Sequence, residues 1–187
     1  MADLLVLNGS PRTKGNCSYL ARRASELMKG AGSTVEVVAV ASKKIGPCTG
    51  CDLCRAEAAD YCVFKDGMTE IYESVIAAKA LLFVTPVYWF AYSAQLKLVV
   101  DRLYGLWNHD NSFLKGRPVG VALVYGDADI YSSGGINAIG SFEHMFRFLG
   151  ADLRGFAYGT ANDPGDAEKN EGLLRDFDGL LARLRNP

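Results

Sequence analysis

The sequence predicts a doubly wound α/β domain in three layers, built on a parallel sheet of five strands. Short apolar runs alternate five times with amphipathic helical stretches along the 187 residues. Such alternation is typical of a parallel sheet that helices cover on both faces. Right-handed crossovers leave few topologies, and the strand order 2-1-3-4-5 suits five strands. Because there is no internal repeat, low-complexity tract or linker, we expect a single domain over residues 1–187.

The expected strands are short apolar runs, most of them followed by residues that favour turns. The third run is followed by Thr85 and Pro86, and proline is disfavoured inside a central strand. The runs are residues 4–7, 35–40, 80–84, 119–125 and 156–158, the last being part of a strand.

The expected helices have apolar residues three or four positions apart, so that these residues share one face. Gly30 and Gly32 end the first helix, and Asp66 is a candidate cap of the second. The apolar positions of the five helices are Leu20, Ala24, Leu27 and Met28; Met68, Ile71, Val75 and Ile76; Leu96, Val99, Val100, Leu103 and Trp107; Ile136, Ile139, Phe142, Phe146 and Leu149; and Leu173, Leu174, Phe177, Leu180, Leu181 and Leu184.

Composition excludes several classes of protein. Hydrophobic residues make up 49% and charged residues 22% of the chain, which is typical of a globular protein with a buried core. The net charge of −1 provides no broad field for nucleic acid or an anionic membrane, and no apolar run approaches the ~20 residues that span a bilayer. The first residues have no basic segment or cleavage site, so we expect a cytoplasmic protein whose cysteines are thiols or metal ligands.

Ligands of such sheets lie beyond the carboxyl ends of the strands. The loop after the first strand leads to a helix N-terminus, where free backbone N–H groups and the helix dipole favour an anion. Its polar groups suit phosphate, because Arg12 offers a forked charged donor and the neighbouring residues offer neutral ones. The candidate phosphate ligands are Ser10, Arg12, Asn16, Cys17 and Ser18. The loop matches neither the Walker A nor the Gly-x-Gly-x-x-Gly pattern, and the alternative is an ordinary polar turn.

Two further loops complete the expected crevice. After the third strand, apolar and aromatic residues suit a planar ring, although they would equally suit packing over the next helix or a dimer contact. These residues are Pro86, Val87, Tyr88, Trp89 and Phe90. After the fourth strand, Gly126 and Asp127 are candidates for the third side, or simply turn residues. On the helix that follows the third strand, Lys97, Asp101 and Arg102 are expected to form surface ion pairs.

Four of the five cysteines lie within fifteen positions, in a cysteine-rich loop at residues 46–66. Cys48, Cys51, Cys54 and Cys62 have the spacing C-x2-C-x2-C-x7-C. Three causes remain open: a [4Fe–4S] cluster, a structural zinc ion, or thiols without metal. The two histidines, His109 and His144, have no nucleophile partner in a recognisable motif, so hydrolase chemistry has little support.

Ser10-Pro11-Arg12, with Gly15-Asn16-Cys17-Ser18 and Pro86-Val87-Tyr88-Trp89, resembles the flavin segments of the NADPH-dependent FMN reductase family. The cysteine run resembles that of the iron–sulfur flavoprotein branch. The resemblance implies a flavodoxin-like fold that binds FMN, with the phosphate on the first loop, the ring against residues 86–90, and a possible [4Fe–4S] cluster on the four cysteines. No side chain is then needed as a catalytic acid or base, because hydride passes directly to the flavin.

Three functions are compatible with this resemblance. The first is an oxidoreductase that uses NAD(P)H to reduce a flavin, a quinone or another small acceptor. The second is an iron–sulfur flavoprotein that carries electrons from ferredoxin through the cluster. The third is a flavin-binding sensor or carrier without turnover. The family also implies a homodimer or a dimer of dimers.

Overall fold

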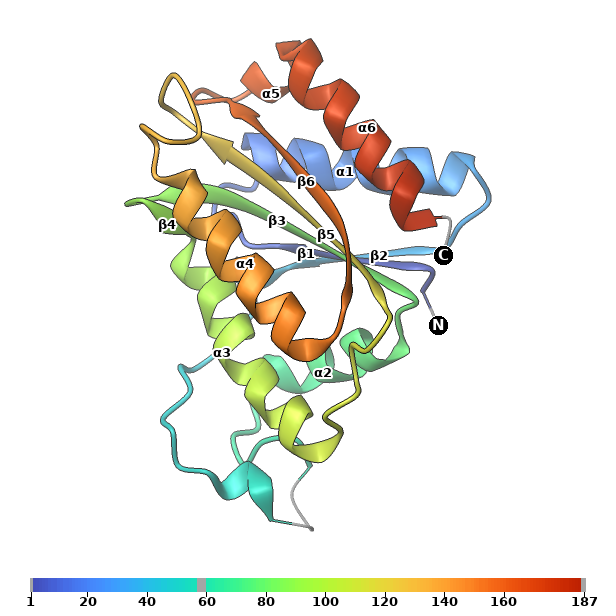
Figure 1. Cartoon of the computed structure of the whole chain (residues 1–187), viewed down its shortest axis with the longest axis vertical. Helices are drawn as coiled ribbons and strands as arrows, with labels where there is room; N and C mark the ends of the chain where they lie inside the picture. Colours follow the sequence, from blue (N-terminus) through green and yellow to red (C-terminus); the bar gives the residue numbers. More distant parts are fainter. Residues whose placement is uncertain (1, 57–59, 186–187) are drawn as a thin grey trace.

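The computed structural model describes residues 2–56 and 60–185 and has three layers (Figure 1). Its five parallel strands are β1 (Leu4–Asn8), β2 (Val35–Ala39), β3 (Ala80–Tyr88), β5 (Pro118–Tyr125) and β6 (Asp152–Thr160). Their order across the sheet is β2-β1-β3-β5-β6. Counted among the parallel strands alone, this is the order 2-1-3-4-5, so the predicted flavodoxin-like architecture is confirmed.

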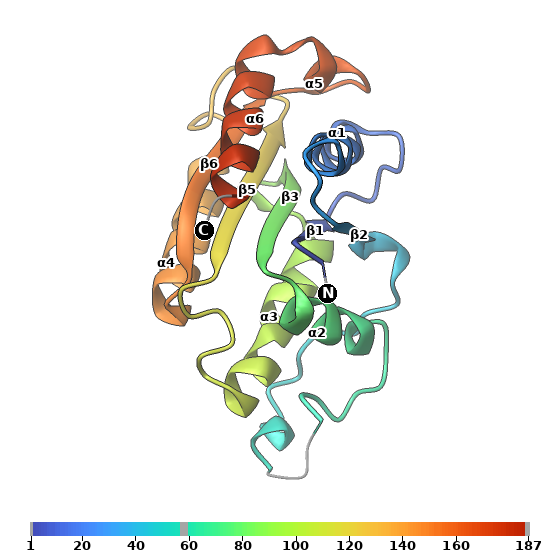
Figure 2. The same cartoon turned by 90° about the vertical axis from the view of Figure 1, so that its right-hand side faces the viewer.

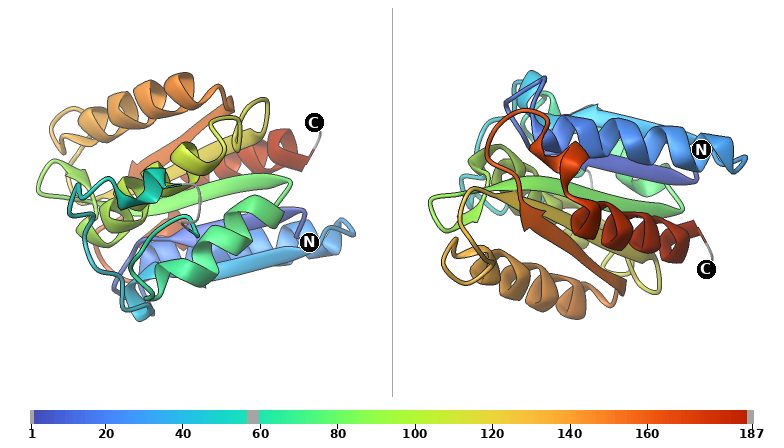
Figure 3. Two further views of the ribbon diagram at one scale, coloured as in Figure 1. Left: turned by 90° about the horizontal axis from the view of Figure 1, so that it is seen from below. Right: turned by 90° about the horizontal axis from the view of Figure 1, so that it is seen from above.

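Helices cover both faces of the sheet, as Figure 2 and the two views in Figure 3 show. One face carries α1 (Asn16–Gly30), the short α5 (Asp166–Lys169) and α6 (Glu171–Arg185). The other carries α2 (Met68–Ala77), α3 (Ala94–His109) and α4 (Gly135–Leu149). Two short 3-10 turns, Val40–Ser42 and Leu53–Arg55, lie in the connection between β2 and α2.

Alternation along the strands builds two separate cores. Successive side chains of a strand point to opposite faces. Leu5 and Leu7 of β1 therefore pack with α2, α3 and α4, whereas Leu4 and Val6 pack with α1 and α6. All four side chains are fully buried. A central strand buried on both faces is a continuous apolar run, and this is why β1 was recognisable in the sequence.

The third strand is longer than predicted and runs through Pro86 to Tyr88. β1 ends at Asn8, opposite Val84, so at Thr85 and Pro86 the parallel neighbour of β3 is β5 alone, on one side. Proline is tolerated at such an edge-like position. The chain then turns back into the short strand β4 (Ala91–Tyr92), which pairs antiparallel with β3 and was not expected.

The last strand is also longer than predicted. β6 begins at Asp152, and an irregularity in its pairing with β5 falls between Val119 and Gly120. Gly155 lies there with a φ of 126°, a conformation that favours glycine. The irregularity interrupts the apolar pattern and hid the start of the strand. Within the described residues, none of the helices is both long and apolar enough to cross a membrane.

Candidate functional site

The loop after β1 is closed by its own side chains. The backbone N–H of Ser10 donates to Asn8 Oδ1 at 3.0 Å, and that of Arg12 donates to Ser10 Oγ at 3.2 Å. The Ser18 hydroxyl donates to the carbonyl oxygen of Arg12 at 2.9 Å and accepts from Asn8 Nδ2 at 3.1 Å. Ser18 therefore shapes the loop, rather than offering its hydroxyl to a ligand.

The loop delivers the chain to α1 through Gly15, and no side chain among the described residues caps this helix. A Cβ atom at Gly15 would lie 2.9 Å from Arg12 Cβ and 3.2 Å from the Arg12 carbonyl oxygen, so only glycine fits without a shift. The first-turn N–H groups of a helix have no partner within the helix. Those of Asn16, Cys17 and Ser18 are thus the donors that this helix N-terminus offers.

The side chain of Asn16 is used inside the protein. Its Oδ1 accepts from the backbone N–H groups of Gly165 and Ala167, each at 3.2 Å. Its Nδ2 donates to the carbonyl oxygens of Ala161 and Asp163 at 2.9 and 3.0 Å. Asn16 therefore ties α1 to the connection after β6, and its contribution to a ligand is its backbone N–H.

The segment after β3 forms a tight hairpin. Val87 pairs with Tyr92 and Tyr88 with Ala91, which leaves Trp89 and Phe90 as the two turn residues. Both have positive φ angles, 48° and 66°. Two positive φ angles define a type I′ hairpin turn, in which Asn and Gly are usual. The Trp89 side chain is 93% exposed and the Phe90 side chain 53% exposed.

Ser93 joins the hairpin to the first loop. Its hydroxyl donates to the carbonyl oxygen of Gly9 at 2.7 Å and accepts from the N–H of Leu96 at 3.3 Å, so it also caps α3. Its own N–H donates to Thr85 Oγ1 at 3.1 Å. A Cβ atom at Gly9 would lie 2.7 Å from Leu96 Cβ, so the two segments approach too closely for a larger residue at position 9.

These loops and the ends of β5 and β6 surround a cavity of about 160 Å³ at the carboxyl edge of the sheet. The guanidinium of Arg12 lies 6.0 Å from the centre of the Tyr88 ring, within cation–π range. Burial raises the pKa of the Cys17 thiol, so Cys17 is a neutral part of the wall. The lining residues are Ser10, Arg12, Asn16, Cys17, Pro86, Val87, Tyr88, Val124, Tyr125, Gly126, Ala161 and Asn162.

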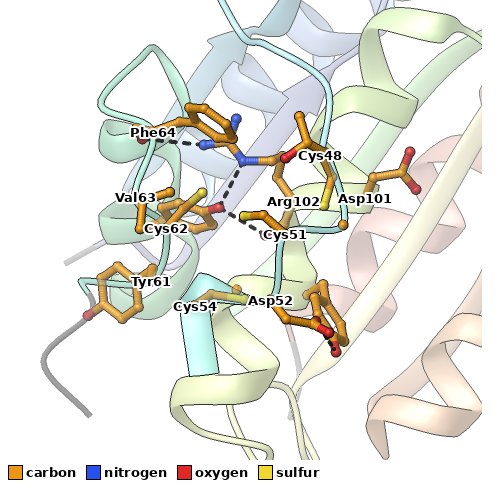
Figure 4. A pocket seen from close by; sticks show the side chains of 15 residues that line it. Cys48, Cys51, Asp52, Cys54, Tyr61, Cys62, Val63, Phe64, Asp101 and Arg102 are labelled. Carbon is orange, nitrogen blue, oxygen red and sulfur yellow. Dashed lines mark hydrogen bonds between the residues drawn. The ribbon is translucent and has the colours of Figure 1, made fainter. Parts of the chain in front are cut away.

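The cysteine loop lies beside the C-terminal half of α3, away from this cavity (Figure 1). Cys48, Cys51, Cys54 and Cys62 all line a second, small cavity together with aromatic residues and Arg102 (Figure 4). Cys48 and Cys51 are exposed, and Cys54 and Cys62 are half-buried. Burial raises the pKa of Cys54.

As the cysteine loop is arranged here, a [4Fe–4S] cluster does not fit. The cavity measures about 20 Å³, which is about the space of one water molecule. In residues 2–56 and 60–185, no three His, Cys, Asp or Glu side chains are placed to hold a metal ion. The donor chemistry suits iron–sulfur or zinc, but the structure does not support either group.

Arg102 corrects one expectation. It was predicted on the surface with Lys97 and Asp101, and those two do form an exposed ion pair. The Arg102 side chain is only 1% exposed and pairs with Asp66, its Nη1 lying 3.0 Å from Asp66 Oδ2. Arg102 directly follows Asp101, and one step along a helix rotates the side-chain direction by about 100°. This rotation directs Arg102 towards the cysteine loop, whereas Asp101 faces the solvent.

A comparison with known protein families shows the family to which the chain belongs. The family model of the NADPH-dependent FMN reductases matches residues 2–156. The chain belongs to this family. The predicted resemblance to this family is therefore confirmed.

Relatives similar in sequence carry names of two kinds, iron–sulfur flavoprotein and FMN-containing oxidoreductase. An iron–sulfur flavoprotein of Methanosarcina thermophila is 38% identical over 120 residues, which are 64% of this chain and 61% of that protein. A Bacillus subtilis protein named as an NAD(P)H-dependent FMN-containing oxidoreductase, YwqN, is 31% identical and covers 97% of this chain and 94% of its own length. An FMN-dependent NADH-azoreductase of Bacillus anthracis, solved with FMN, has a TM-score of 0.70 at 17% identity with complete coverage of both chains, and supports the fold alone.

Most of the residues predicted to bind flavin line this one cavity. Of the predicted flavin residues, Ser10, Arg12, Asn16, Cys17, Pro86, Val87, Tyr88 and Gly126 meet at the cavity. Ser18, Trp89, Phe90 and Asp127 lie outside its lining. Asp127 is exposed, and its carbonyl oxygen accepts from Thr160 Oγ1 at 2.8 Å.

Of the lining residues that sequence analysis missed, Val124 and Tyr125 end β5, whereas Ala161 and Asn162 follow β6. Asn162 lies against Gly126, where a Cβ atom would come within 2.9 Å of Asn162 Oδ1. The signal was available, because all parallel strands end at the same edge of the sheet and the fifth loop belongs to the crevice as well.

Proposed function

We propose that the chain is an FMN-dependent oxidoreductase, and that the cavity at the start of α1 holds the FMN phosphate. The uncapped first turn of α1 carries this proposal, because its free N–H groups and dipole attract a phosphate. The exposed guanidinium of Arg12 adds a charged donor that suits phosphate oxygens. The residues present therefore fit the phosphate end of FMN.

The remaining walls suit the rest of the cofactor. At about 160 Å³ the cavity is smaller than the ~300–1,000 Å³ of a full small-molecule pocket. We therefore assign it to the phosphate end, with the flavin ring at its open side against Pro86, Val87 and Tyr88. Flat aromatic and apolar groups suit such a ring. Gly126 and Asn162 form the third side.

Bound FMN would supply the redox chemistry, accepting a hydride from NAD(P)H and passing reducing equivalents to a flavin, a quinone or another small acceptor. The chain binds and orients the cofactor. Arg12 and the first turn of α1 hold the anionic end, Gly9 and Gly126 allow neighbouring walls to approach closely, and Gly15 allows the first loop to fold against Arg12. The proposal needs no side chain as an acid or base, and Cys17 stays protonated because burial raises its pKa.

An FMN titration followed by anaerobic stopped-flow kinetics with NADH and NADPH tests this function. We expect flavin binding, rapid flavin reduction by at least one nicotinamide, and weaker binding in Arg12→Ala. Arg22→Ala is the matched control, since Arg22 is exposed on α1 and lies outside the cavity lining. Tight FMN binding without reduction by either nicotinamide would favour the sensor or carrier. Equal affinities of Arg12→Ala and Arg22→Ala would contradict the assignment of Arg12.

The second candidate is an iron–sulfur flavoprotein that receives electrons from ferredoxin. One observation favours it: all four cysteines of the predicted run line a single cavity. The space there would have to open before a cluster could enter. Iron and acid-labile sulfide, assayed on protein purified without oxygen, decide the matter. About four of each per chain would establish the cluster, and their absence would leave the simple reductase.

We further propose that the chain assembles as a homodimer or a dimer of dimers. The exposed aromatic side chains of Tyr88, Trp89 and Phe90 beside the flavin cavity are compatible with such an interface. Light scattering measures the assembly directly, and a monomer at micromolar concentration would contradict it.

A further inference from the structure

The two ends of the cysteine loop are held together by one buried side chain. Nη1 of Arg102 donates to the carbonyl oxygen of Gly46 and to Asp66 Oδ2, both at 3.0 Å. Nη2 reaches the carbonyl oxygen of Phe64 at 3.5 Å and Asp66 Oδ1 at 3.4 Å. The same carboxylate accepts from the N–H of Gly46 at 2.9 Å. One guanidinium therefore touches the chain just before Cys48 and just after Cys62.

The guanidinium is itself fixed in place. Its Nε donates to the Tyr72 hydroxyl at 3.3 Å, and that hydroxyl donates to the Arg102 carbonyl oxygen at 2.9 Å. Burial alone would lower the pKa of Arg102, but the hydrogen bonds with Asp66 and Tyr72 outweigh it and keep the side chain charged. We call Arg102, Asp66 and Tyr72 the clasp. The planar guanidinium of Arg102 donates to several acceptors at once, which an ammonium group could not do with the same geometry.

The rest of the loop rests on the same face of α3. A Cβ atom at Gly105 would overlap the carbonyl oxygen of Tyr61, so the loop backbone touches the helix backbone there. Asn108 Nδ2 donates to Cys54 Sγ at 3.4 Å. Residues 102, 105 and 108 are three apart and share one helix face. This face of α3 is shaped to receive the cysteine loop.

We propose that Arg102 is the positioning residue of the cysteine loop. Its guanidinium hydrogen-bonds to Gly46, Phe64 and Asp66 at the two ends of the loop, which we call the neck. These bonds hold Cys54 and Cys62 half-buried against the common cavity, while Cys48 and Cys51 stay exposed. Arg102 acts on the exposure of the thiols themselves, independently of the proposed flavin chemistry and of any metal.

The test is the alkylation rate of each cysteine in the full-length, metal-free protein, read by peptide mass spectrometry after iodoacetamide pulses. Cys17 is 1% exposed and serves as an internal reporter of global unfolding. We expect Arg102→Met to raise the rates of Cys54 and Cys62 about tenfold, because local opening becomes easier, with Cys17 still protected. Arg102→Lys should restore part of the protection. Lys97→Met, on the exposed face of α3, is the matched control and should change nothing.

Unchanged rates at Cys54 and Cys62 in Arg102→Met, with Cys17 protected, would overturn the proposal. If Cys17 reacts as well, the variant has unfolded, and Asp66→Asn and Tyr72→Phe take its place, since each weakens the clasp and keeps the guanidinium. Faster alkylation of Cys54 and Cys62 alone in these two variants supports the clasp. Wild-type rates in both overturn it.

Discussion

The hairpin turn at Trp89 and Phe90 allows a prediction with an unusual sign. Replacing Trp89 by Asn should stabilise the protein, although it removes a large aromatic side chain. An L-residue in the left-handed region costs about 1–2 kcal/mol relative to its ordinary conformations, and Asn tolerates this region far better. Trp89 has a φ of 48° and is 93% exposed in the single chain, so little buried area is lost when unfolding is measured at a dilution where the chain is monomeric.

The expected gain is about 1 kcal/mol in the free energy of unfolding. The edge contact between the Trp89 and Phe90 rings, with centres 5.9 Å apart, reduces the gain but does not cancel it, since both rings are largely exposed. For a domain of this size, about 1 kcal/mol corresponds to a rise of ~2–4 °C in Tm. Urea unfolding followed by circular dichroism should show a higher midpoint with an unchanged slope.

Phe148→Asn provides the comparison. Phe148 is 70% exposed but lies within helix α4, so the same kind of substitution relieves no strain and should leave stability equal or lower. If Trp89→Asn also leaves the midpoint unchanged or lowers it, the strain argument is wrong. Because Trp89 lies outside the cavity lining, its replacement should also leave FMN affinity unchanged.

Three more outcomes follow from the described contacts. Gly15→Ala should weaken FMN binding and lower the free energy of unfolding by about 1–3 kcal/mol, because its Cβ would press on Arg12. A flavin titration checks the change in binding, and Gly30→Ala is its control, since a Cβ there would meet no described atom within 4 Å. Cys17 should resist iodoacetamide at pH 8.5 in the folded protein and react once denaturant is added, since burial raises its pKa; alkylation at the rate of an exposed thiol would contradict its buried placement. The Asp66 carboxylate has a lowered pKa: burial would raise it, but Arg102 and two backbone N–H groups outweigh that effect. A carboxylate whose pKa is lowered on folding contributes stability above its unfolded pKa of ~3.9 and loses it as the pH falls through the folded value. Urea midpoints from pH 6 to pH 2 should therefore fall more steeply in the wild type than in Asp66→Asn, and parallel curves would refute the role of this ion pair.

The fold was predictable because its determinants are local. The run Leu4 to Leu7 is apolar at every position, as a strand buried on both faces requires, and the helices show their buried face through spacing alone. From such elements, the handedness of crossovers leaves little choice of strand order. The place of the first loop at the cavity was predictable for the same reason, because the carboxyl end of the first strand leads to a helix N-terminus.

What sequence analysis missed depended on contacts between distant segments or on strain. Trp89 and Phe90 carry no signal for a type I′ turn, since aromatic residues rarely adopt positive φ. Arg102 shares a helical turn with a true surface pair, and its burial depends on Asp66, which lies 36 residues earlier. The hydrogen bonds of Asn16 to Ala161 and Asp163 span more than 140 positions, so its structural role was not visible from the first loop alone.

The closed neck at Gly46 and Asp66 has a consequence for the versatility of the domain. The two ends of the cysteine loop are hydrogen-bonded to each other, so their positions are fixed relative to the sheet whatever the length of the segment between them. Doubling the length of such a segment adds only about 0.6 kcal/mol of closure entropy. These two fixed ends therefore tolerate a longer, shorter or cysteine-free segment between them, while the cavity at the other end of α3 keeps its shape.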